Sequence, residues 1–468
     1  MSEQPAAAGI TAALAAAALA PVEDPAARDR AADLLLDYLA IAHRGGGAPA
    51  AQHAQEALLP GTSGDCRVEG ADARTDARTA TLLNGIAAHA LELDDTYEPA
   101  SLHPGVVVWP VVLALAETTG CSRDDMLDAA IAGYDVTCEV GDLVGAARAY
   151  ARGFHPTGIC GALGAATAAG RLLGLDATQL EHALGLAASE ASGLLAFLTA
   201  GGWTKPLHAG HASACGLDAA RLAGAGYEGP AGAVEGRFGV VHAFGGEQPA
   251  SDAPAPDGAP AHGDGPMPGA AASTREGWRP RPAGWAVHAT SVKFHPCCRY
   301  LHGNLDLLIE LVREHRIVAV DVAAIRCAVL SAGWDLVAAP ADAKREIRGQ
   351  VDAQFSMPFG AARAVAYGAV PLAAFERAAA EARELGDLIA RVECVRDAQL
   401  DAAFPTLWGG AVALELHDGT VLEARTPTFR GSPGQPADRA AIRAKATELL
   451  PADVVAALEA RSASVVAR

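Results

Sequence analysis

Alanine-rich stretches with apolar residues at helical spacing run through most of the first half of the chain. Alanine costs the least free energy to place in a helix, and strand-favouring aromatic residues make up only 5% of the 468 residues. The first stretch follows Asp24 and Pro25, which form a cap and a favourable first helical position, and a triple glycine from Gly45 ends it. The pattern predicts a compact all-helical domain with helices at 26–42, 77–93, 106–119, 124–150, 158–173, 177–198 and 205–225.

The second half of the chain predicts a mixed α+β domain. Short strand-like runs occur at 324–330 and 391–396, and Asp418-Gly419 between the alternating runs 411–417 and 420–425 predicts a hairpin. Helical segments at 302–315, 359–367 and 371–384 are interleaved with these strands. We therefore expect a mainly α protein, consisting of a large all-helical domain at 1–284, a smaller α+β lid domain at 285–427 and C-terminal helices at 428–468 that return to the helical domain.

A segment of unusual composition interrupts the helical domain at 246–272. It consists almost entirely of Gly, Pro, Ala, Ser and Asp, which cannot bury enough apolar surface to offset the entropy of ordering. We predict a flexible surface insertion there.

Charge and cysteine usage narrow the class of protein. A net charge of −19 argues against nucleic-acid binding, but it does not exclude an anionic small substrate, whose binding depends on the few groups that line a cleft. The nine cysteines show no disulfide or CxxC spacing, residues 1–20 carry Glu3 where a signal peptide has basic residues, and no apolar run is long enough for a bilayer. We expect a cytoplasmic protein without a membrane partner.

The first candidate site segment is 91–105, LELDDTYEPASLHPG. Asp94 and Asp95 end a predicted helix, where the helix dipole disfavours a carboxylate, so local stability rules do not explain the pair. His103 precedes the next helix, and an unperturbed imidazole titrates near neutrality. The structural alternative is that an aspartate caps a turn and His103 is a loop histidine.

The second segment is 153–164, GFHPTGICGALG. His155 leads into Thr157 and Gly158 at a helix start, where free backbone amides can receive a carboxylate and His155 can transfer a proton beside it. The alternative is close helix packing through the glycines, with His155 as a cap.

The third segment is 201–216, GGWTKPLHAGHASACG. Lys205, His208 and His211 recur every three residues and therefore share one helix face. A metal-ligand pair is conceivable, but HExxH is absent and no third ligand is evident, so a bound anion suits the three groups better. Solvated side chains over a packed face are the alternative.

The fourth segment is 291–306, SVKFHPCCRYLHGNLD, at the start of the second domain. It supplies positive charge and hydrogen-bond donors from Lys293, His295, Arg299, Tyr300 and His302. The adjacent cysteines at 297 and 298 are best read as a buried, inert pair, because the further thiolates of an iron–sulfur centre are not apparent. One polyanion-binding cleft explains all four segments together.

These segments, with Asn84-Gly85 and His89 and with QFSMPFGAARAVAYG at 354–368, resemble the successive signatures of the MmgE/PrpD family, in order from about residue 10 to 460. The resemblance implies a large helical domain with an α+β lid, a homodimer, and an active site in the cleft between the domains. It implies no cofactor and no metal. The residues implied around the substrate are Asp94, His103, His155, Lys205, Lys293 and Tyr300, supported by Thr96, Thr157 and His208.

The family's chemistry removes or adds a proton beside a carboxylate. The lysines and the helix-start amides near Thr157 would neutralise substrate carboxylates, and His103, oriented by Asp94 and partnered by His155, would transfer the proton to carbon. The leading expectation is a 2-methylcitrate-like dehydratase acting on a small carboxylic acid. The alternatives are a cis-aconitate-type decarboxylase, an epimerase or isomerase of a substituted dicarboxylate, and a non-catalytic polycarboxylate-binding protein.

Overall fold

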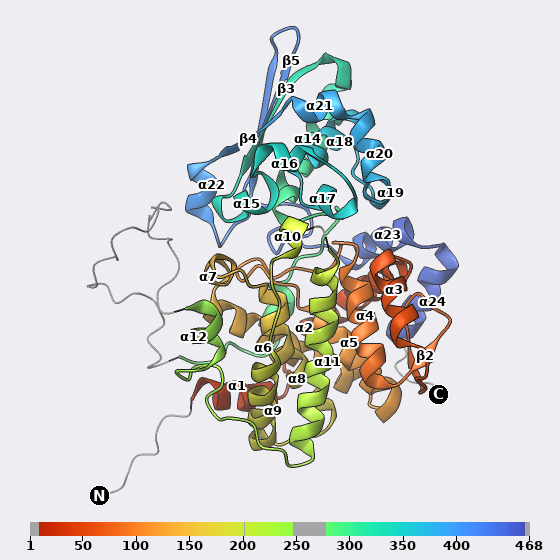
Figure 1. Ribbon diagram of the computed structural model, residues 1–468, viewed down its shortest axis with the longest axis vertical. Helices are drawn as coiled ribbons and strands as arrows, with labels where there is room; N and C mark the ends of the chain where they lie inside the picture. Colours follow the sequence, from red (N-terminus) through yellow and green to blue (C-terminus); the bar gives the residue numbers. More distant parts are fainter. Residues whose placement is uncertain (1–8, 201, 247–277, 464–468) are drawn as a thin grey trace, which may run out of the picture.

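The computed structural model describes residues 9–200, 202–246 and 278–463. A helical body forms the lower part of the molecule, and a smaller domain with a four-stranded sheet lies on top of it (Figure 1). None of the helices in these described ranges is long and apolar enough to span a bilayer. The mainly α architecture with a smaller α+β domain, expected from the sequence, is confirmed.

The helical body packs around a central helix, α8 (Pro156–Leu172), which is buried over almost its whole length. Its glycines allow the close contacts: a Cβ on Gly161 would lie 2.6 Å from the Val107 side chain, and one on Gly164 would overlap Thr137. The other elements of the body are α1 (Ile10–Ala18), α2 (Pro25–Gly45), α3 (Pro49–Leu58), β1 (Cys66–Arg67), β2 (Arg74–Thr75), α4 (Ala77–His89), α5 (Gly105–Thr119), α6 (Arg123–Val144), α7 (Ala146–Ala151), α9 (Ala177–Glu190), α10 (Phe197–Ala200), α11 (Thr204–Gly224), α12 (Val240–Gly245) and α13 (Trp285–His288).

Three predicted helices are shorter than the sequence pattern indicates. Helix α4 ends at His89 instead of continuing to residue 93, and Gly145 at φ 77° separates α6 from α7. Helix α9 ends at Glu190 because the chain then turns so that the Gly193 carbonyl accepts a hydrogen bond from the His155 amide at 3.0 Å. The first and third of these breaks place loops beside the candidate site.

The lid is built on the sheet β4-β3-β5-β6, in which β3 (Val322–Val329) pairs in parallel with β4 (Val392–Arg396) and antiparallel with β5 (Gly410–Leu416). The hairpin from β5 to β6 (Val421–Thr426) turns at Gly419, whose φ is 88°. The lid helices are α14 (His302–His315), α15 (Trp334–Val337), α16 (Ala341–Arg345), α17 (Gln350–Gln354), α18 (Met357–Tyr367), α19 (Leu372–Glu376), α20 (Ala378–Glu384), α21 (Gly386–Ala390) and α22 (Ala398–Ala403), with 3₁₀ turns η1 (Arg299–Leu301), η2 (Ala319–Asp321) and η3 (Ser331–Gly333).

The two domains have separate hydrophobic cores, and the chain passes between them twice. Ala286 and Val287 of α13 lie in the core of the helical body, so the lid core begins near Cys297 and not at residue 285 as expected. Helices α23 (Arg439–Leu449) and α24 (Ala452–Ala463) pack against α2, back on the helical body. Apart from Gly246, the insertion predicted at 246–272 lies outside the described residues.

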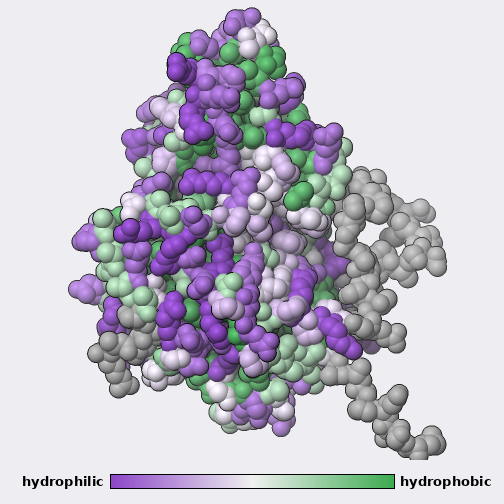
Figure 2. Space-filling model, turned by 180° about the vertical axis from the view of Figure 1, so that it is seen from behind, coloured by the Kyte–Doolittle hydropathy of each residue, from purple (hydrophilic) through white to green (hydrophobic). Residues whose placement is uncertain are grey.

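Seen from behind, the described surface is mostly polar, with apolar residues in scattered small patches (Figure 2). Large apolar side chains are instead concentrated in the two cores. Several of the charged and polar side chains predicted for the site are also buried, among them His103, Lys205 and Lys293.

Candidate active site

A small internal cavity of about 30 Å³ lies between the helical body and the lid. Of the residues singled out from the sequence, seven line it: Thr96, His103, His155, Lys205, Lys293, Arg299 and Tyr300. Five others do not line it: Asp94, Thr157, Gly158, His208 and His295. All four sequence segments therefore contribute to one buried site.

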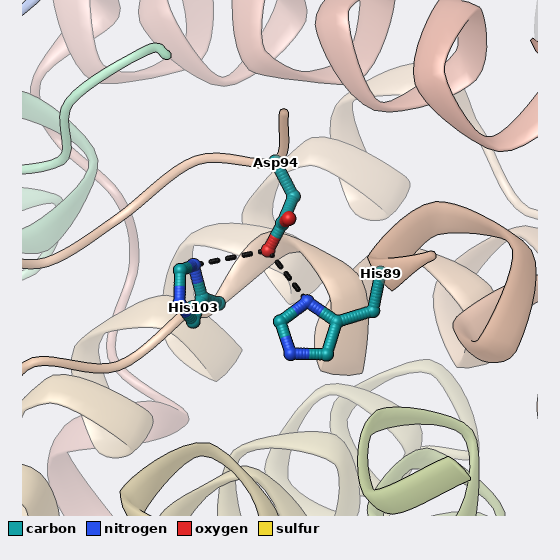
Figure 3. Close-up of side chains that lie close together, drawn as sticks. All are labelled: His89, Asp94 and His103. Atoms are coloured by element: carbon teal, nitrogen blue, oxygen red, sulfur yellow. Dashed lines mark hydrogen bonds and ion pairs between the residues drawn. The ribbon is translucent and has the colours of Figure 1, made fainter. Parts of the chain in front are cut away.

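Asp94 lies between two histidines, His89 and His103, of which His103 lines the cavity (Figure 3). Its Oδ2 is 2.9 Å from Nδ1 of His89, at the end of α4, and 3.0 Å from Nδ1 of His103. Because a single carboxylate oxygen faces both ring nitrogens, each histidine donates an N–H to Asp94. The three side chains thus form a His–Asp–His arrangement.

The tautomer of His103 follows from its surroundings. Its Nδ1 also lies 2.8 Å from the Asp95 carbonyl oxygen and 3.2 Å from the Thr96 hydroxyl. With a carboxylate and a carbonyl as acceptors, Nδ1 carries the hydrogen, so Nε2 is the nitrogen that can accept or donate a proton in chemistry. The His103 backbone amide donates to the Thr157 hydroxyl at 3.1 Å and fixes this loop on α8.

Burial sets the charge states in this arrangement. Burial lowers the pKa of His89 to about 4 and also lowers the pKa of His103, although the Asp94 carboxylate partly opposes both shifts. Burial would raise the pKa of Asp94, but hydrogen bonds from His89 and His103 and the charge of Lys293 hold that pKa well below its usual range. The site therefore contains a charged carboxylate beside neutral imidazoles.

Among the described residues, His89, Asp94 and His103 form the one acidic and histidine group compact enough to hold a metal ion. Both Nδ1 atoms face the same carboxylate oxygen as hydrogen-bond donors, and a metal would need their lone pairs instead. The arrangement fits a hydrogen-bonded relay better than a ligand set.

The ring of His155 stacks on the ring of His89, with their centroids 5.8 Å apart. Its Nδ1 is 3.3 Å from Nδ1 of His208, so one of these rings donates to the other. Burial, together with the charge of Lys205, holds the pKa of His155 well below its usual range and lowers that of His208 to about 4. His208 therefore supports His155 and does not itself reach the cavity.

Lys205 and Lys293 both pair with the carboxylate of Glu92, which was not among the predicted site residues. Lys205, from the start of α11, and Lys293 both donate to the side chain of Glu92, with Lys293 Nζ 3.1 Å from Oε2. Burial would raise the pKa of Glu92, but the charges of the two lysines outweigh it and hold that pKa well below its usual range. The same carboxylate, together with Asp94, raises the pKa of Lys293 against the effect of burial.

Arg299 adds a third positive group. Its Nε donates to Glu98 at 3.2 Å, while Nη1 and Nη2 are buried without a hydrogen-bond partner. Burial lowers the pKa of Arg299 to about 10, which leaves it charged at neutral pH. A buried guanidinium with two free nitrogens is suited to bind a carboxylate.

Three predicted substrate contacts have other roles. The start of α8 is covered by the 192–193 segment, since a Cβ on Gly158 would lie 2.3 Å from the Ser192 carbonyl oxygen. The expected carboxylate site at the amides near Thr157 is therefore closed by the protein's own backbone. His295 pairs with Asp306 at 2.8 Å, away from the cavity.

Glu92 and Glu98 were not among the predicted site residues, and His89 was named only as part of the family signature. His89 and Glu92 lie in a stretch that the sequence pattern assigns to one continuous helix. In the structure, the helix ends at His89 and Glu92 adopts φ 56°, which turns its side chain towards the lysines. The signal in the sequence that could have pointed to Glu92 is the cluster of acidic residues in ELDD at 92–95.

Comparison with known proteins gives the family. Residues 8–252 match the MmgE/PrpD N-terminal domain, and residues 295–468 match the MmgE/PrpD C-terminal domain. The chain belongs to the MmgE/PrpD family. Together with the family match, the similarity to proteins named as decarboxylases identifies this MmgE/PrpD protein as an enzyme of the lyase class.

Three of these relatives are named for cis-aconitate decarboxylase. The cis-aconitate decarboxylase-like protein oryM of Aspergillus oryzae is 29% identical over 86% of this chain and 83% of its own length. The cis-aconitate decarboxylase of Aspergillus terreus (strain NIH 2624) is 28% identical over 61% of this chain and 56% of its own length. The human cis-aconitate decarboxylase is 38% identical over 34% of this chain and 33% of its own length.

Proposed function

We propose that this MmgE/PrpD enzyme is a decarboxylase for a small tricarboxylate of the cis-aconitate type. The observation that carries the proposal is the combination, around one cavity, of Lys205, Lys293 and the unpaired nitrogens of Arg299 with the free Nε2 of His103. The relatives favour decarboxylation, which was the alternative from the sequence, over the leading expectation of a 2-methylcitrate-like dehydratase.

Binding uses the three cations as separate anchors for separate carboxylates. Lys205 belongs to the helical body, whereas Lys293 and Arg299 lie on the segment that leads into the lid. A substrate held by all three joins the two domains and excludes water, which strengthens each electrostatic contact.

The reaction balances with one proton donor. In a cis-aconitate-type acid, a CH₂–COO⁻ group is attached to a carbon–carbon double bond that carries a carboxylate at its far carbon. When the C–C bond to the CH₂–COO⁻ carboxylate breaks, its electron pair forms a new double bond and CO₂ leaves. The former double-bond pair then takes a proton at the far carbon, and the product is a dicarboxylate.

His103 is the proposed proton donor, through Nε2. The three negative charges of the substrate raise the pKa of this imidazole from its lowered value in the empty site, so that Nε2 takes up a proton as the acid binds. Asp94 stabilises the resulting imidazolium through the Nδ1 hydrogen bond. Solvent restores the proton after each turnover.

Proton NMR of the purified enzyme with cis-aconitate in deuterated water tests the proposal. A dicarboxylate product with a single deuterium on the carbon beside the carboxylate supports it. Hydration products from cis-aconitate, water loss from 2-methylcitrate, or deuterium exchange without net reaction would assign a dehydratase or an epimerase instead. His103→Ala should abolish turnover and keep binding of the acid, and unchanged turnover would remove His103 from the mechanism.

A further inference from the structure

Glu92 is held in an unusual conformation between the two lysines. Its φ of 56° lies in the left-handed region, which is unfavourable for a non-glycine residue. Only 3% of the residue is exposed, and each carboxylate oxygen contacts a different lysine. The ion pairs thus hold a strained backbone in place.

The Glu92–Lys205 pair also separates two spaces. The inner cavity of about 30 Å³ has room for water only, far less than a tricarboxylate needs. Beyond it lies a wider pocket of about 470 Å³ that reaches the surface near Trp203, which is 47% exposed, and Arg348. Glu92, Lys205, Phe197 and Phe355 line both spaces and form the wall between them.

The two lysines differ in how tightly they hold Glu92. Lys293 is fully buried, lines only the inner cavity and lies 3.3 Å from the Glu92 carbonyl oxygen as well as contacting its carboxylate. Lys205 faces both spaces and contacts Glu92 through the side chain. An acid that arrives from the wider pocket therefore meets Lys205 first.

We infer that Glu92 is an internal counter-ion that stays with Lys293 and gives up Lys205 to a substrate carboxylate as the acid passes from the wider pocket into the inner cavity. The inference rests on the proposed function. In the structure, Glu92 pairs with two buried ammonium groups, which are costly without a partner. On binding, the incoming carboxylate takes its place on Lys205 and the wall opens.

The test is the affinity for tricarballylate, a saturated tricarboxylate that cannot react, measured by calorimetry on Glu92→Gln and wild type. If a substrate carboxylate replaces Glu92 on Lys205, tricarballylate should bind to Glu92→Gln at least about tenfold more tightly than to wild type, because the competing carboxylate has been removed. If Glu92 merely positions the lysines, the variant binds more weakly. Asp128→Asn is the matched control, since it breaks an ion pair with Arg28 that lines neither space and should leave the affinity unchanged.

Glu92→Asp provides a second variant if Glu92→Gln does not fold. Its shorter side chain cannot span both lysines, so tricarballylate should bind more tightly than to wild type, though less so than expected for Glu92→Gln. Equal or weaker binding by the folded variants, with wild type binding normally, overturns the exchange. Absence of binding to wild type argues instead against the proposed tricarboxylate function.

Discussion

Replacing Asp94 by Asn tests the proposed role of His103 most directly. The Asp94 carboxylate lies 3.0 Å from Nδ1 of His103, which places the charge centres of Asp94 and an imidazolium roughly 4 Å apart. At an effective dielectric constant of about 20, this separation gives an interaction of about 4 kcal/mol. Asparagine retains a hydrogen bond, so we expect the protonated form of His103 to lose about 3 kcal/mol of this stabilisation, which lowers the pKa of His103 in the complex.

The direction in which the pH profile of kcat moves follows from the role of His103 as a proton donor. Wild-type kcat should fall as pH rises through the pKa of bound His103, and Asp94→Asn should move this fall to lower pH, because the imidazolium loses its anion. At neutral pH, kcat should drop about a hundredfold. The assay is kcat against pH, followed by NMR of the product.

Thr96→Val is the matched control, because it removes a neutral partner 3.2 Å from the same Nδ1 and keeps the charge of Asp94. We expect less than about a tenfold loss of kcat and no movement of the pH profile. If the Asp94→Asn profile overlays that of wild type, Asp94 does not stabilise a proton on His103 and the reasoning is wrong.

Three further predictions follow from the buried charges. Lys205→Ala should raise KM about a hundredfold, with a smaller change in kcat, because it removes a substrate anchor; an unchanged KM would contradict this. Lys445→Met leaves Asp37 buried without its cation and should lower the free energy of unfolding in urea by about 3–5 kcal/mol; a loss below about 1 kcal/mol would mean that the pair contributes little. Burial raises the pKa of Asp95 to about 7, so its protonated form stabilises the native state at pH 5 and this contribution is lost as pH rises through 7. Asp95→Asn resembles that neutral form, and its unfolding free energy relative to wild type should rise by about 2 kcal/mol between pH 5 and 8; a flat difference would show that Asp95 titrates normally.

Much of the fold is encoded locally and was predictable. Helix α2 begins at its Asp24 cap and Pro25, and the lid hairpin turns at Gly419 as Asp-Gly predicts. The breaks after His89 and Glu190 were not predictable, because helical periodicity continues through both. They depend on contacts with distant segments, such as the Gly193 carbonyl that meets the His155 amide.

The sequence by itself determined which residue types were available for chemistry, since four segments rich in histidine and lysine stand at helix boundaries. Only the tertiary structure decided which of them meet. Glu92 contacts lysines 113 and 201 positions away, and Glu98 contacts Arg299 over 201 positions. Spacing along the sequence predicts contacts only between residues up to about four positions apart on a helix. An ion pair between residues more than a hundred positions apart produces no periodic pattern in the sequence. For that reason the lysines, Arg299, His103 and its partner Asp94 were found from the sequence, but Glu92 and Glu98, which hold the lysines and Arg299, were not.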